Sequence, residues 1–350
     1  MGQPRPSFGM HYSTELGHRR GIAMNPATIY QAKRGARALC VLVVPITVVF
    51  FARYFFNNTI ETNLIDYNFI SPSQAYAMNP IPAVVISSLY NFGFAFCATM
   101  TLCAAVILSS GRIIWIQSHP NWLLWLMIGG WFVISVWVFC RLAFYLPDCN
   151  SYCLPSSISQ KLIDPLKNLP VYENNLGPSR HSIGNTGTSL MQIVVPGFAL
   201  IAVAAVSYLL ALASVVLNQQ DTQLRMQVMA NLTMLVSVTF MMTVVATHLL
   251  FQPVADMIAE AYPSYKSAGA AAAQSFAHLR NAMTLYWATI FSLALATAYF
   301  TARISIGPDE NASTTGLWRI SKEVLAVLSP LITGGVLQLG TAIIDALPTQ

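Results

Sequence analysis

The sequence predicts an all-α membrane protein, a polytopic bundle of about six transmembrane helices with little soluble mass. Three observations support this prediction: 9% of the 350 residues are charged, 55% are hydrophobic, and the apolar residues are concentrated in long uncharged blocks. A soluble globular chain carries roughly 25% charged residues, so this composition cannot cover a water-exposed surface. The blocks are therefore expected to cross a bilayer as helices, in which backbone groups bond one another.

Six of the apolar blocks are long enough to cross a membrane. A hydrocarbon core of roughly 30 Å requires about 20 helical residues at a rise of about 1.5 Å each. The blocks cover residues 38–56, 82–110, 122–146, 190–217, 228–251 and 282–302. We therefore expect a six-helix transmembrane bundle over 38–302, with an outer loop cap at 147–189.

A seventh uncharged block, residues 324–344, is interrupted by Pro330, Gly334 and Gly335. A break exposed to lipid would leave backbone groups without hydrogen bonds, so such a segment normally rests against protein or lies at the interface. We predict a broken or interfacial helix here, within a C-terminal cytoplasmic segment at 303–350. The alternative is a seventh span.

Residues 1–37 form a basic tail, with six Lys or Arg residues and one acidic residue. Basic flanks remain in the cytoplasm and bind anionic lipid headgroups, so the N-terminus is expected to be cytoplasmic. In that orientation the cytoplasmic segments carry eleven Lys or Arg and the outer segments carry five. Without a cleaved signal peptide, which bulky residues such as Tyr54 and Phe55 disfavour, the expected location is a bacterial inner (plasma) membrane. Within the tail, Pro26 after Asn25 predicts the start of a helix.

Three basic or titratable residues are placed near the outer ends of predicted spans: Arg53, Arg141 and His248. Together they are a candidate anion site, a positively charged collar that would set selectivity at a pore mouth. The alternative is structural, because such side chains also extend to the interface or form ion pairs, for example between Arg141 and Asp148.

The fifth predicted span carries hydroxyl residues on one face. At about 100° per residue, the directions of these side chains fall within an arc of roughly 120°. The residues are Thr233, Ser237, Thr243 and Thr247. Such a face lines a water-filled pore, or else its hydroxyls bond backbone carbonyls and join helices. Asn91 and Asn231 are weaker candidates of the same kind.

Small residues recur along two predicted spans. The first set runs from Gly197 to Ser214, and the second consists of Ala288, Ser292 and Ala296. In lipid, helices associate by close packing, for which small side chains are needed. Both stripes therefore predict seams between helices, within one chain or between subunits.

Two cysteines, Cys149 and Cys153, lie in the predicted outer loop, on the oxidising side. They are a candidate disulfide; two free thiols are the alternative, because such close cysteines need a special geometry. A zinc site is disfavoured, since structural zinc normally takes four Cys or His ligands and His181 is the only further one in that loop. No catalytic, cofactor or metal site is predicted.

Several missing features narrow the function. The predicted spans contain no Asp or Glu, which disfavours proton-coupled transport, and no histidine pair that would bind haem. Motifs for phosphate binding, zinc proteolysis and serine hydrolysis are missing, and the basic residues do not indicate a nucleic-acid surface. The leading hypothesis is a channel, pore or non-proton-coupled transport component, working as an oligomer. The alternative is a non-transporting membrane subunit or sensor that engages a membrane protein partner; an intramembrane enzyme ranks lower.

Overall fold

The computed structural model describes six long helices and a few shorter pieces. The helices are α1 (Pro26–Glu61), α3 (Ala83–Gln117), α7 (Leu190–Leu217), α8 (Thr222–Leu250), α10 (Ala268–Ile306) and α11 (Gly316–Ala346). The other described residues are 125, 128–133, 136–137, 252–253, 256 and 307. All six helices are long and apolar enough to cross a membrane, and the described part of the chain contains no strand. The predicted polytopic helical membrane protein is confirmed.

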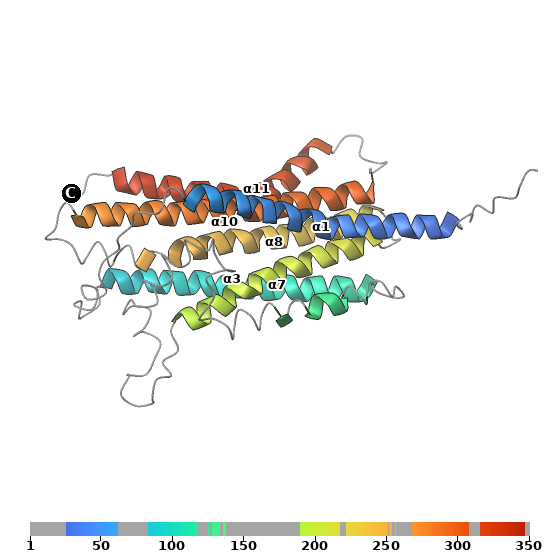
Figure 1. The fold of residues 1–350 in the computed structure, drawn as a ribbon, viewed down its shortest axis with the longest axis horizontal. Helices are drawn as coiled ribbons and strands as arrows, with labels where there is room; N and C mark the ends of the chain where they lie inside the picture. The colour runs from blue at the N-terminus through green and yellow to red at the C-terminus, as the bar shows by residue number, and fades with distance from the viewer. Residues whose placement is uncertain are drawn as a thin grey trace, which may run out of the picture.

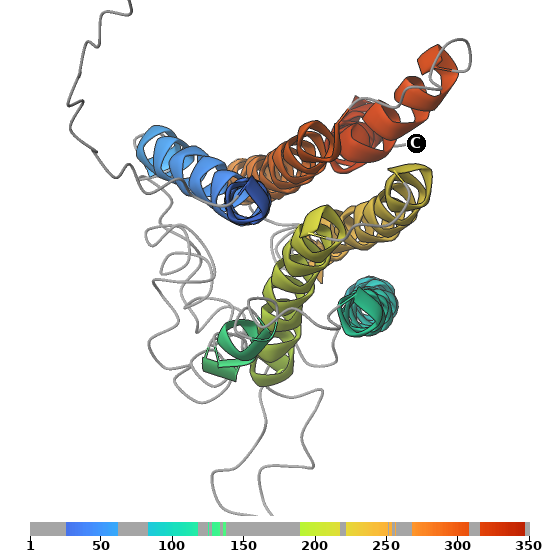
Figure 2. The same cartoon turned by 90° about the vertical axis from the view of Figure 1, so that its right-hand side faces the viewer.

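The long helices lie roughly parallel or antiparallel to one another (Figure 1). We call the end at which α1 begins and α3 ends the proximal end, and the opposite end the distal end. Seen from the proximal end, α1, α10 and α11 form one layer, and α3, α7 and α8 form the other (Figure 2). Across the layers, α8 packs against α10 and α11, and α7 packs against α1. The six long helices of the described chain therefore form two three-helix layers joined mainly through α8.

α1 begins at Pro26, as the Asn25-Pro26 pair predicted. Proline is favoured at the first helical position, because its missing N–H would have had no helical acceptor there. The helix then continues without interruption through the candidate span Ala32–Phe55. The basic residues 33, 34 and 37 therefore lie on the same helix that crosses the membrane.

The core lies where the two layers meet. In α7, 67% of the candidate span is buried, whereas the figure is 17% for α1 and for α11, which are peripheral. An aromatic stack joins the layers: the rings of Phe240 in α8 and Phe291 in α10 are 4.4 Å apart, and Trp287 stacks on Phe291 at 5.4 Å. Such pairs add about 0.5–1.5 kcal/mol beyond simple burial.

The predicted seams are contacts between helices in this structure. A Cβ added to Gly197 of α7 would lie 2.2 Å from the ring of Phe96 in α3, so a larger residue there would require the Phe96 ring to move. A Cβ added to Gly334 of α11 would lie 2.7 Å from the Cβ of Ala288 in α10. The small residues thus bring backbones close together within one chain.

Two of the predicted apolar blocks, 122–146 and 324–344, differ from the others in the structure. For 122–146 the structure describes only residues 125, 128–133 and 136–137, which are helical, so most of that prediction lies outside the described residues. The block at 324–344 belongs to a helix that continues through Pro330 and contains the candidate span Glu323–Gly340. Its length and composition match the alternative prediction, a membrane span. Its first turns run obliquely before the remainder lies along α10, so the helix is bent (Figure 1).

Candidate functional site

Polar side chains from three parts of the fold meet at the distal end of the bundle. We call this group the distal cluster; it consists of Ser88, His248, Gln252, Asp256, Arg280 and Thr284. Ser88 comes from α3, His248 from α8, and Arg280 and Thr284 from α10, while Gln252 and Asp256 follow α8 in the chain. Ser88, His248, Arg280 and Thr284 are all buried. The cluster therefore links both layers at one end.

A chain of hydrogen bonds runs through the distal cluster from α10 to α3. Arg280 Nη1 donates to Gln252 Oε1, and Gln252 Nε2 donates to Asp256 Oδ1 at 2.8 Å. Ser88 Oγ lies against the other carboxylate oxygen of Asp256 and also 2.7 Å from the carbonyl of Val84, and its single proton serves one of them at a time. A guanidinium and a carboxylate are thus connected through one amide.

His248 is bonded to α10 in the same cluster. Its Nδ1 lies 3.1 Å from Thr284 Oγ1, and Thr284 donates its hydroxyl proton to the Arg280 carbonyl at 2.8 Å. Because the threonine proton is used in that shorter bond, His248 donates from Nδ1, which assigns the proton to Nδ1. The Arg280 charge also acts on the His248 ring.

Two of the three residues of the predicted collar belong to the described part of the chain. Arg53 of α1 and His248 of α8 are both at the distal end. Arg141, Cys149 and Cys153 lie outside the described residues. Arg280, 6% exposed, is a buried cation among the described residues of this end, and it lies two residues before the predicted block 282–302.

The hydroxyl face of α8 is directed into protein. Thr243 and Thr247 donate to the carbonyls of Thr239 and Thr243, each at 2.8 Å. Thr233 does the same to Met229 and lies 2.9 Å from the hydroxyl of Tyr208 in α7. All three threonines are buried. These contacts are the ones expected from the alternative to a pore, in which the hydroxyls bond backbone carbonyls and join helices.

Ser237, the remaining residue of that face, completes the hydrogen bonds of α11. Pro330 has no N–H, so the carbonyl of Ala326 lacks its normal helical donor. The hydroxyl of Ser237 in α8 donates to this carbonyl, and that of Ser329 lies 2.8 Å from it. We call this arrangement, together with Ser292 described next, the α11 joint.

Ser292 of α10 completes the α11 joint from the other side. The N–H of Leu331 donates to Ser292 Oγ at 3.0 Å. Non-helical hydrogen bonding inside a bilayer is tolerated where neighbouring helices supply partners. Two neighbouring helices thus supply hydrogen-bond partners beside Pro330, Ser237 of α8 for the Ala326 carbonyl and Ser292 of α10 for the Leu331 N–H, and α11 packs against both helices.

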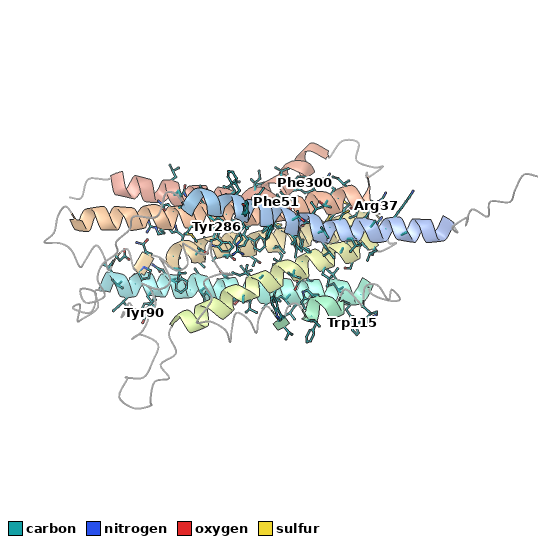
Figure 3. The ribbon with its side chains drawn as sticks, in the orientation of Figure 1. Arg37, Phe51, Tyr90, Trp115, Tyr286 and Phe300 are labelled. Carbon is teal, nitrogen blue, oxygen red and sulfur yellow. The ribbon has the colours of Figure 1, made fainter. Side chains whose placement is uncertain are left out.

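At the proximal end, α10 and α11 are joined by an ion pair between Arg303 and Glu323. The side chain of Glu323 is 9% exposed. It is the first residue of the last candidate span, so the predicted lack of acidic residues holds for the other five described spans and not for this one. Also at this end, Arg37 of α1 donates to the carbonyl of Ser305 at 3.4 Å, and Figure 3 places Arg37 near the end of α10.

Within the described residues, no group of three or more His, Cys, Asp or Glu side chains is placed to hold a metal ion. The three described cysteines, Cys40, Cys97 and Cys103, are free thiols. Comparison with known protein families, with curated proteins and with solved structures found no match to this chain. Its function therefore has to be argued from its own residues.

Proposed function

We propose that the chain is a channel, pore or non-proton-coupled transport component of a membrane. The observation that carries the proposal is Arg280, a cation buried at the distal end of a candidate span and connected to α3 and α8 through the distal cluster. Charged groups inside membrane proteins are costly, and where they are kept they commonly serve ion or substrate pathways. Arg280 lies beside His248, which was selected from the sequence for the same role.

The proposed orientation places the proximal end in the cytoplasm. The described distal end carries Arg53 and Arg280, whereas the described proximal end carries Lys33, Arg34, Arg37, Arg112, Arg225, Arg303, Arg319 and Lys322. An excess of basic residues marks the cytoplasmic side of membrane proteins. The distal cluster would then face the outer side, where a solute or ion first meets the bundle.

Flux through the purified chain in liposomes tests the transport proposal. Ions and small anions are supplied under varied voltage and pH, and the wild-type chain is compared with Arg280→Gln and with Arg112→Gln, a control at an exposed proximal position. We expect flux above that of empty vesicles, reduced about tenfold or more by Arg280→Gln and unchanged by the control, as for loss of one charged contact. Wild-type vesicles that behave like empty ones under every condition would contradict the proposal.

A second candidate function is a non-transporting membrane subunit or sensor that engages a protein partner. This function is favoured by the threonine hydroxyls of α8, which are buried and donate to backbone carbonyls instead of lining a water-filled path. Crosslinking in native membranes should then recover a stoichiometric partner, and deletion of residues 1–37 should abolish its recovery. Recovery that is the same with and without the tail would count against this role of the tail.

A further inference from the structure

Pro330 divides α11 into two arms. We call residues 316–329 the proximal arm and residues 331–346 the distal arm. The distal arm lies along α10, whereas the first turns of the proximal arm diverge from it (Figure 1). A proline inside a helix removes a backbone hydrogen bond and is a frequent cause of sharp bends. The two arms therefore meet at a hinge.

The distal arm is fixed to α10 at two heights. Gly334 lies so close to α10 that an added Cβ would be 2.7 Å from the Cβ of Ala288. One turn further along α11, Gln338 Nε2 donates to the carbonyl of Asn281 at 2.8 Å. Close packing at small residues and hydrogen bonds between helices are the contacts that hold helices together in lipid. The distal arm is therefore expected to stay in place when the proximal arm moves.

The proximal arm is held far from the hinge by the ion pair between Glu323 and Arg303. Glu323 is seven residues from Pro330, about 10 Å along the helix. Between these two points Val327 is buried, whereas Leu325 is 60% exposed. Because an ion pair needs the charges of both partners, one change at either residue breaks it. The ion pair is thus placed as a latch at the end of a lever.

The α11 joint offers the carbonyl of Ala326 two hydroxyl donors, one from each side of the hinged contact. Ser237 of α8 donates to this carbonyl across the interface between the helices. Ser329, 2.8 Å from the same oxygen, belongs to the proximal arm and moves with it. A serine hydroxyl bonded to a carbonyl in the preceding turn is a local contact that also favours bending. The carbonyl therefore keeps a donor when the arm leaves α8, which lowers the cost of that movement in a bilayer.

We propose that the proximal arm of α11 is a hinged strap that moves between two positions about Pro330. In the docked position Ser237 bonds the α11 joint and the ion pair of Glu323 is closed. In the released position both contacts are broken, the distal arm is unchanged, and α11 is separated from α8 at the proximal end. A few residues that absorb the change of direction between two packed segments are the usual construction of such a device. The proposal does not depend on the transport function, because the same strap would move in a non-transporting subunit.

Distances between spin labels in bicelles test the proposal. The labels are attached at Leu325→Cys in the proximal arm and Leu108→Cys in α3, two exposed positions, in the full-length chain with its six native cysteines replaced. A swing of about 30° would displace Leu325, about 7.5 Å from Pro330 along the helix, by about 4 Å. We expect one main distance for the latched chain. Glu323→Gln and Arg303→Gln should each add a second population, longer by about 4 Å or more.

A charge reversal separates the latch from damage to the fold. The double variant Arg303→Glu, Glu323→Arg should restore the single distance, and Pro330→Ala should suppress the second population in the Glu323→Gln chain. Val336→Cys, an exposed position of the distal arm, is the matched control, and its distance to Leu108→Cys should be the same in every variant. The proposal would be overturned by a Glu323→Gln chain that keeps only the latched distance, by a charge reversal that does not restore it, or by a distal-arm label that moves as far as the proximal one.

Discussion

The distal cluster and the α11 joint bury polar groups between the same two layers, but they do so with different chemistry. The distal cluster uses a guanidinium, a carboxylate and an imidazole, whereas the joint uses hydroxyls and backbone groups only. Ser237 and His248 are eleven residues apart on α8, about 16 Å along the helix axis. Charges are thus found near the end of the spans and neutral groups deeper, as expected when burying a charge costs more than burying a hydroxyl.

The largest effect should follow loss of the charge in the distal cluster. Arg280→Met removes the donor to Gln252 and leaves Asp256 without its connected cation. We expect the free energy of unfolding in bicelles to fall by about 2–4 kcal/mol. Arg112→Met, at an exposed site, should change it by less than about 0.5 kcal/mol. Equal losses for the two variants would show that the distal cluster does not stabilise the layers.

A smaller effect is expected at the contact between α10 and α11 beside the joint. Gly334→Ala places a methyl group against Ala288, whereas a Cβ at the neighbouring Gly335 meets nothing within 4 Å. Gly334→Ala should lower the free energy of unfolding by about 1–3 kcal/mol. Gly335→Ala should be neutral or stabilising by up to about 1 kcal/mol. The melting temperatures of the two variants are compared in one detergent, and similar values would contradict the expected difference between Gly334 and Gly335.

The smallest effects concern single hydroxyls. Ser292→Ala removes the acceptor for the Leu331 N–H and should cost about 1 kcal/mol of unfolding free energy, near the upper range for such bonds in membranes. Thr243→Val removes only a bond to a carbonyl within its own helix and should cost less than about 0.5 kcal/mol. Denaturant titrations in mixed micelles would distinguish the unfolding free energies of the two variants. The reverse order would mean that the intrahelical hydroxyls matter more than the joint.

Sequence patterns predicted the helices well because each span is a continuous apolar run. The predicted block 190–217 has the same limits as α7. The small residues Gly197 and Ala288 were correctly placed at seams, since only small side chains allow such contacts in lipid. Sequence patterns do not predict which helix lies beside a given side chain. Periodicity gives the direction of the Ser237 side chain, but only the packing shows that it meets Ala326 of α11.

Two charged residues were not predicted to be buried, because the limits of the predicted spans were set by hydropathy. Arg280 lies two residues before the predicted block 282–302, whereas α10 begins at Ala268. Glu323 was excluded by a limit placed one residue too late, while the candidate span begins at Glu323 itself. A charge at a helix end can be bonded inside the bundle while it still interrupts the apolar run. Scanning the turn that precedes each apolar run would have identified both.

The central claim is that the Ser237 hydroxyl of α8 replaces the backbone bond that Pro330 removes from α11. A double-mutant cycle of Ser237→Ala and Pro330→Ala, measured as free energy of unfolding in bicelles, tests it directly. In the wild-type background Ser237→Ala should cost about 1 kcal/mol, and in the Pro330→Ala background, where residue 330 regains its N–H, it should cost nearly nothing. Equal costs in both backgrounds would contradict the claim.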